Sequence, residues 1–78
     1  MIDKYNNAFI ESLGVEANVI NDELKYNEID EWDSIGHMTL VAALEEAFNI
    51  TFETDDIIDF SSYKKGKEIL SKYGIKDL

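Results

Sequence analysis

An acid, a hydroxyl and an imidazole stand close together in the stretch Asp33-Ser34-Ile35-Gly36-His37. Ser34 and His37 are one helical turn apart, so the stretch could hold a nucleophile and its base. Against this, side chains in an exposed first turn have no enclosing pocket and no separate oxyanion donors, and the chain has no second His. We therefore expect no catalytic residues, and we expect His37 to lie on the surface near Ser34.

Ser34 has two other possible roles. A Ser before a helix is commonly an N-cap, whose hydroxyl accepts a hydrogen bond from the first turn. A Ser hydroxyl exposed at a helix start is also well placed to carry a phosphodiester, because the helix amides and dipole stabilise the attached phosphate. The apolar stripe of Ile35, Met38 and Ala42 beside it would give a modifying enzyme a surface to grip.

The other ligand-like residues do not form a metal site. Cys is absent, which excludes a Cys-based zinc site and a disulfide framework. The acids of residues 22–33 do not fit a calcium-binding EF-hand, which needs ligands at alternating positions, a central Gly and a terminal Glu. We therefore expect no bound metal.

Negative charge is concentrated in the middle of the chain. The formal net charge is −10, and all seven Lys lie outside residues 26–63, a span that holds ten acids. Such a field repels phosphate backbones and anionic lipids, so nucleic acid and membrane surfaces are poor partners. It would attract a basic protein surface, with a plain solvated acidic face as the alternative.

The apolar spacing predicts an all-α fold made of one domain, residues 1–78. We expect a small four-helix bundle, with three main helices, one short helix and a long loop after the first helix. The expected helices cover 3–13, 34–48, 54–60 and, from Ser61 or Ser62, the segment up to Tyr73. The loop over residues 15–33 is long for a compact domain, and such loops are often functional or contain a short helical turn. Its scattered apolar residues indicate that it is pinned across the bundle.

Residues at the expected helix ends support these boundaries. The end residues are Gly14, Asn49 and Gly74 as terminators and Asp33, Thr54 and Ser61 or Ser62 at the starts. The core face of the 34–48 helix is predicted to consist of Leu40, Val41, Leu44 and Phe48. Gly66 should weaken the last helix by about 1 kcal/mol relative to Ala.

The chain carries no cationic start followed by an apolar run, and no apolar stretch approaches the length needed to cross a bilayer. We therefore expect a soluble cytoplasmic protein, and we expect it to be a monomer.

The chain resembles the acyl carrier proteins from about residue 5 to residue 73. Asp33-Ser34-Ile35 is similar to the Asp-Ser-Leu signature of that family, with Ile in place of Leu. The stretch Leu40–Phe48 resembles the second helix of the family. The sequence that follows also resembles the family, at Phe52, Thr54-Asp55-Asp56 and Ser61-Ser62.

The resemblance implies a carrier that catalyses nothing itself. Ser34 would be the attachment point for 4′-phosphopantetheine, transferred from coenzyme A by a holo-acyl-carrier synthase or phosphopantetheinyl transferase. The thiol of the arm would carry acyl groups as thioesters to acyl-activating, acyltransferase or condensing enzymes with basic docking surfaces. The implied contact residues are Asp33, Ile35, Met38, Ala42, Glu45 and Glu46, with Glu53 and Asp56 secondary.

The chain also departs from the fatty-acid-synthesis pattern of that family. Gly36 and Thr39 stand where acids are frequent, and Trp32 is bulkier than the usual small residue. These departures favour a specialised, stand-alone carrier in a secondary or surface-polymer pathway over one in housekeeping fatty-acid synthesis, and polyketide synthesis stays open. An aminoacyl or peptidyl carrier using the same Ser34 is one alternative, and an unmodified acidic helical adaptor is another.

Overall fold

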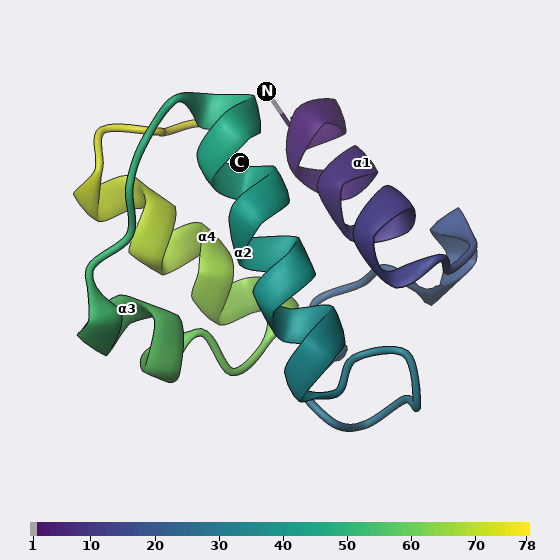
Figure 1. The fold of residues 1–78 in the computed structure, drawn as a ribbon. Helices are drawn as coiled ribbons and strands as arrows, with labels where there is room; N and C mark the ends of the chain where they lie inside the picture. Colours follow the sequence, from purple (N-terminus) through teal and green to yellow (C-terminus); the bar gives the residue numbers. More distant parts are fainter. Residues whose placement is uncertain (1) are drawn as a thin grey trace.

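The computed structural model describes residues 2–78, and these residues form four α-helices and one short 3-10 helix, without strands. The elements are, in chain order, α1 (Ile2–Leu13), η1 (Ala17–Val19), α2 (Ser34–Phe48), α3 (Thr54–Asp59) and α4 (Tyr63–Lys72). In the view of Figure 1, α1 packs along α2, and α3 and α4 lie on the other side of α2. The predicted all-α bundle is confirmed, and the short η1 is the helical turn expected within the long loop.

An aromatic cluster joins the helices to the loop before α2. The ring of Phe9 in α1 lies 5.3 Å from Trp32 of the loop and 5.3 Å from Tyr63 of α4, measured between centroids. Tyr5 packs against the rings of Phe9 and Tyr63, and its buried hydroxyl donates to the Tyr63 carbonyl oxygen at 2.6 Å. Large aromatic side chains contribute much of the apolar area that a small domain can bury. Because Trp32 is fully buried here, the core also holds the residues that precede α2.

The inward face of α2 follows the predicted apolar spacing. Leu40, Val41 and Leu44 are buried, as expected, while Phe48 is half-buried and packs against the edge of the core. None of the helices in residues 2–78 is both long and apolar enough to span a membrane.

Local capping chemistry sets most of the helix ends. Asp33 caps α2, the Ser62 hydroxyl accepts from the Lys65 amide at 2.9 Å, and Asn49 ends α2 in the left-handed conformation, with a φ of 54°. The predicted cap at Thr54 is wrong, because Thr54 is the first residue of α3 and no side chain caps that helix. α3 and α4 each end one residue earlier than predicted, at Asp59 and Lys72.

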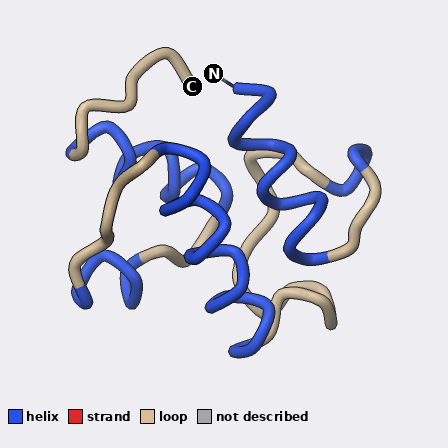
Figure 2. Tube along the Cα trace, turned by 45° about the horizontal axis from the view of Figure 1, so that its top comes forward, coloured by secondary structure: helices blue, strands red, loops and turns tan. Residues whose placement is uncertain are grey.

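The long loop is pinned across the bundle, as predicted. Its middle forms an isolated antiparallel bridge with the segment before α4, in which the Tyr26 amide donates to Ser61 and the Tyr63 amide donates to Leu24, both at 2.9 Å. Figure 2 shows this loop running from the end of α1 to the start of α2. The loop therefore holds the residues beside the α2 start in fixed positions.

Gly66 has a different role from the one predicted. It is buried in α4, where a Cβ atom would collide with the Tyr5 hydroxyl and the Phe60 ring. The missing side chain thus allows α4 to approach the aromatic cluster, and this packing outweighs the weak helix propensity of glycine.

Candidate functional site

Ser34 is the first residue of α2, and its side chain is exposed. The N-cap is the preceding residue, Asp33, whose carboxylate accepts a hydrogen bond from the Gly36 amide at 2.8 Å. Because Asp33 performs this function, the Ser34 hydroxyl is not required to cap the helix. Of the two roles considered for Ser34, the structure therefore removes the N-cap and leaves an accessible hydroxyl.

The Ser34 hydroxyl has a neighbour that the sequence analysis missed. Its Oγ lies 3.1 Å from the hydroxyl oxygen of Tyr26, which comes from the pinned loop. Tyr26 precedes Ser34 by eight residues within a segment that has no regular period, so no spacing rule connects the two. Only the fold of the loop brings them together.

His37 lies deeper than predicted and is bound on both sides of its ring. Nδ1 accepts a hydrogen bond from the Trp32 indole N–H at 3.0 Å, and Nε2 lies 2.9 Å from the Ile57 carbonyl oxygen. Because Nδ1 accepts, Nε2 must carry the proton and donate to Ile57. The expected surface position of His37 is corrected to a half-buried link between the loop, α2 and α3. Neither nitrogen is free to act as a base for Ser34.

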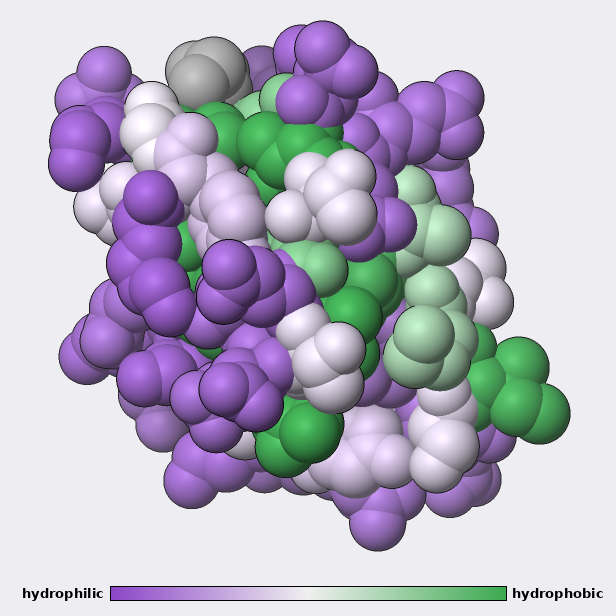
Figure 3. All heavy atoms as spheres, turned by 60° about the vertical axis from the view of Figure 1, so that its left-hand side comes forward, coloured by the Kyte–Doolittle hydropathy of each residue, from purple (hydrophilic) through white to green (hydrophobic). Residues whose placement is uncertain are grey.

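Apolar side chains surround the start of α2 on the outside. Ile35 is 79% exposed, Met38 is 54% exposed and Ala42 is also exposed, so the predicted stripe faces solvent. Ile58 of α3 is 72% exposed and was not expected. Figure 3 shows apolar atoms projecting at the lower right of a surface that is mostly polar on its left. Isolated exposed apolar residues are normal, but several close to one exposed hydroxyl indicate a contact surface.

The acids expected beside this stripe are not equivalent. Asp33, Glu46 and Glu53 are exposed. Glu45 is half-buried, and its carboxylate accepts a hydrogen bond from the Phe52 amide at 2.9 Å, which fixes the chain between α2 and α3. Glu45 therefore has a structural role in addition to any contact it makes.

Asp56 faces inward, although it was expected as a secondary contact. It is only 4% exposed, and its carboxylate accepts hydrogen bonds from Lys72 at 2.5 Å and from the Tyr73 hydroxyl at 2.6 Å. The hydrogen bond from Lys72 and, to a smaller extent, that from Tyr73 lower the pKa of Asp56 below its usual value. The Asp56 carboxylate thus fastens α3 to the end of α4, and we leave it out of the contact surface.

A sequence model of the family described as phosphopantetheine attachment site matches residues 7–65, which is more than half of the chain. The chain belongs to this family. Its members bind 4′-phosphopantetheine as a covalently attached prosthetic group, so the predicted cofactor and the predicted type of carrier domain are both confirmed. The comparisons with curated proteins and with solved structures found no match.

The surroundings of Ser34 fit the phosphodiester of a phosphopantetheine carrier. Among residues 2–78 the amides of Ser34 and Ile35 have no hydrogen-bond partner, whereas those of Gly36 and His37 bond to Asp33. Free amides at the positive end of a helix are suitable donors to a phosphate. A pocket of about 260 Å³ shares Tyr26, the neighbour of the Ser34 hydroxyl, and is also lined by His37, Ile57, Ile58, Phe60 and Ser61.

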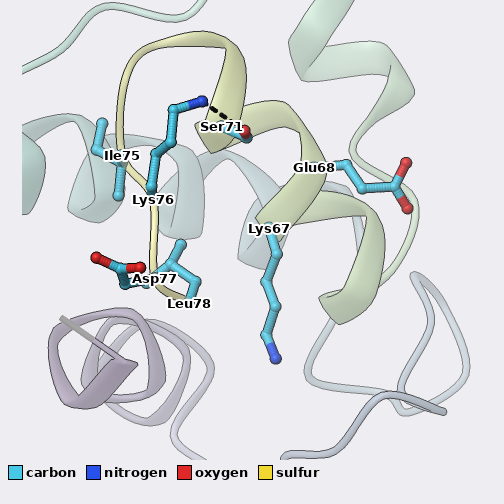
Figure 4. Close-up of a pocket in the computed structure, with 7 residues that line it drawn as sticks. All are labelled: Lys67, Glu68, Ser71, Ile75, Lys76, Asp77 and Leu78. Carbon is cyan, nitrogen blue, oxygen red and sulfur yellow. Dashed lines mark hydrogen bonds between the residues drawn. The ribbon is translucent and has the colours of Figure 1, made fainter.

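A second pocket, of about 390 Å³, lies away from the α2 start. Its lining comes from α4 and the segment after it, namely Lys67, Glu68, Ser71, Ile75, Lys76, Asp77 and Leu78. In Figure 4 the side chains of Lys67 and Glu68 point away from the segment after α4, while Lys76 reaches back to the Ser71 hydroxyl at 3.4 Å. The polar groups of this pocket do not converge on one point, so the smaller pocket is the better candidate for the carrier function.

Proposed function

We propose that this phosphopantetheine carrier is an acyl carrier protein, with Ser34 as the attachment residue. The observation that supports this best is the exposed Ser34 hydroxyl at the start of α2, next to amides without partners. The ten acids between residues 26 and 63 favour acyl over aminoacyl cargo, although α2 itself contributes only Glu45 and Glu46.

In this role the protein binds and presents its cargo and catalyses no step. The arm supplies a terminal thiol on which acyl groups are held as thioesters. His37 has both ring nitrogens in hydrogen bonds, so the base that accepts the Ser34 proton during attachment must belong to the modifying enzyme. The Asp33 cap and the buried Trp32 keep the start of α2 in a fixed shape for that enzyme.

The proposed docking surface is the outer face of α2 around Ser34. It comprises Asp33, Ile35, Met38, Ala42 and Glu46, with Glu45 and Glu53 at its edge. An apolar stripe between exposed carboxylates suits a partner with a basic rim around an apolar centre. The expected partners are a holo-acyl-carrier synthase or phosphopantetheinyl transferase and the acyl-activating, acyltransferase and condensing enzymes.

Intact-mass measurement after incubation with coenzyme A and a broad-specificity phosphopantetheinyl transferase tests the attachment. We expect a mass gain of one phosphopantetheine in the wild type and in Ser71→Ala, a matched control on α4, and no gain in Ser34→Ala. A folded wild-type protein that gains nothing from an active transferase would favour the unmodified adaptor. A gain that persists in Ser34→Ala would move the attachment to another residue.

The nature of the cargo needs a separate experiment. Protein purified from its native cell would be treated with hydroxylamine, which cleaves thioesters, and the released group identified by mass. A fatty or hydroxy acid supports the acyl carrier, and an amino acid would replace it with the aminoacyl carrier.

A further inference from the structure

The Tyr26 hydroxyl is placed to act on the group that Ser34 carries. The two oxygens are 3.1 Å apart, and no other side chain in residues 2–78 makes a hydrogen bond to the Ser34 hydroxyl. Tyr26 is 38% exposed, so one edge of its ring is open to solvent and to an incoming enzyme. The hydroxyl pair therefore lies at the surface, where attachment must occur.

The fold holds both the backbone and the ring of Tyr26 in place. Its backbone amide donates to the Ser61 carbonyl oxygen at 2.9 Å. Its ring meets His37 edge-to-face with centroids 5.3 Å apart and meets the buried Trp32 in the same manner at 6.2 Å. His37 and Trp32 are themselves joined by a hydrogen bond. A side chain packed in this way loses little further freedom when its hydroxyl binds a ligand.

The chemistry of attachment fixes the direction of this hydrogen bond. In the free protein either hydroxyl could be the donor. Once the Ser34 oxygen is esterified it has no hydrogen and can only accept, and the attached phosphodiester carries a negative charge. Residues 26–63 contain no Lys or Arg, so within this span the donors for that charge are neutral groups such as the Tyr26 hydroxyl.

We propose that Tyr26 is a positioning residue for the attachment and the hydrogen-bond donor to the phosphodiester of the loaded protein. This proposal rests on the proposed function of Ser34. In the transfer step, the Ser34 oxygen attacks the phosphorus of coenzyme A that bears the pantetheine. The new O–P bond forms as the anhydride P–O bond breaks, adenosine 3′,5′-bisphosphate leaves with the bonding electrons, and the hydroxyl proton passes to a base of the transferase. Tyr26 holds the Ser34 oxygen in one orientation before this step and donates to the charged diester after it.

The test compares wild type, Tyr26→Phe and Tyr63→Phe. Tyr26→Phe keeps the ring and removes only the hydroxyl. Tyr63→Phe is the matched control, because the hydroxyl it removes bonds to Asn6 of α1. We expect the phosphorus NMR resonance of loaded Tyr26→Phe to differ from that of wild type. We also expect kcat for loading to fall roughly fivefold to tenfold with KM unchanged, as fits the loss of one hydrogen bond between two neutral hydroxyls. Loaded Tyr63→Phe should match wild type in both measurements.

An unchanged phosphorus resonance or an unchanged kcat in Tyr26→Phe would overturn the proposal. This failure is distinct from failure of the proposed function, in which the wild type itself would take up no phosphopantetheine at Ser34. Tyr26→Phe keeps the ring and its contacts, so we expect the fold to be retained. Far-ultraviolet circular dichroism of each variant verifies that the helices are present.

Discussion

Replacing Gly36 by Ala should destabilise the protein even though Ala is the better helix former. A Cβ at this position would collide with the Glu31 carbonyl oxygen and would lie 3.1 Å from a methyl of Leu13. The Glu31 backbone cannot move easily, because the next residue is the fully buried Trp32, whose carbonyl oxygen accepts from Asn27 at 2.9 Å. The loop that leads to Ser34 would therefore have to shift.

The expected size of the effect follows from two opposing contributions. Overpacking costs about 1–3 kcal/mol, and the upper half of that range applies because the obstacle is backbone. Helix propensity returns at most about 1 kcal/mol. The net loss of about 1–2 kcal/mol should lower Tm by roughly 5–15 °C in a domain of this size.

Thermal unfolding followed by circular dichroism measures this change. Thr39→Ala, an exposed substitution one turn later in α2, serves as the control and should leave Tm nearly unchanged. If Gly36→Ala melted at or above the wild-type temperature, helix propensity would dominate at this position and the packing argument for Gly36 would be refuted.

Three further predictions concern polar side chains. His37→Ala should lower the free energy of unfolding by about 2 kcal/mol in urea titrations, because it leaves the indole N–H of the buried Trp32 and the part-buried Ile57 carbonyl oxygen without partners. The hydrogen bond from Lys72 lowers the pKa of Asp56 in the folded protein below its value in the unfolded chain. The Asp56 carboxylate therefore stabilises the fold above its unfolded pKa, and this stabilisation is lost as the pH falls through its folded pKa. Asp56→Asn should therefore show a weaker loss of Tm than wild type between about pH 5 and pH 2. Glu46→Lys should slow association with the transferase at unchanged Tm, whereas Glu45→Lys should also lower Tm.

Much of the fold was predictable because residues at the helix ends determine where each helix starts or stops. Asp33 before Ser34, Asn49 after Phe48 and Ser62 before the last helix each end or start a helix through their own side chain or backbone. Thr54 failed as a cap because α3 begins without any side-chain cap, so local preference did not decide its start.

The surroundings of Ser34 could be predicted only in part. The apolar stripe along α2 follows from helical spacing within one element. Tyr26 and His37 take their partners from other segments, and the partner of His37 in α3 is twenty residues away. Contacts of this kind depend on how the loop is pinned to Ser61, which no periodic pattern in the loop reveals.

The roles of the individual acids were also difficult to predict from the sequence. A sequence gives the number of carboxylates but not which of them are used inside the fold. Asp56 is bound by Lys72 and Tyr73, and Glu45 by the Phe52 amide, whereas Glu46 is exposed. The charge available to a partner is thus smaller and more localised than the formal charge suggests.

Gly36 connects the packing of the loop to the charge of the proposed docking surface. The Glu31 carbonyl oxygen occupies the space of a side chain at position 36, so the acid frequent there in fatty-acid-type carriers would require the loop to shift. The exposed carboxylates of Asp33 and Glu46 instead lie at the two ends of the apolar stripe, about 20 Å apart along the helix axis. A partner suited to this surface would carry basic groups at that separation and apolar side chains between them. Because each charge then acts largely alone at physiological ionic strength, reversing Glu46 should affect association independently of Asp33.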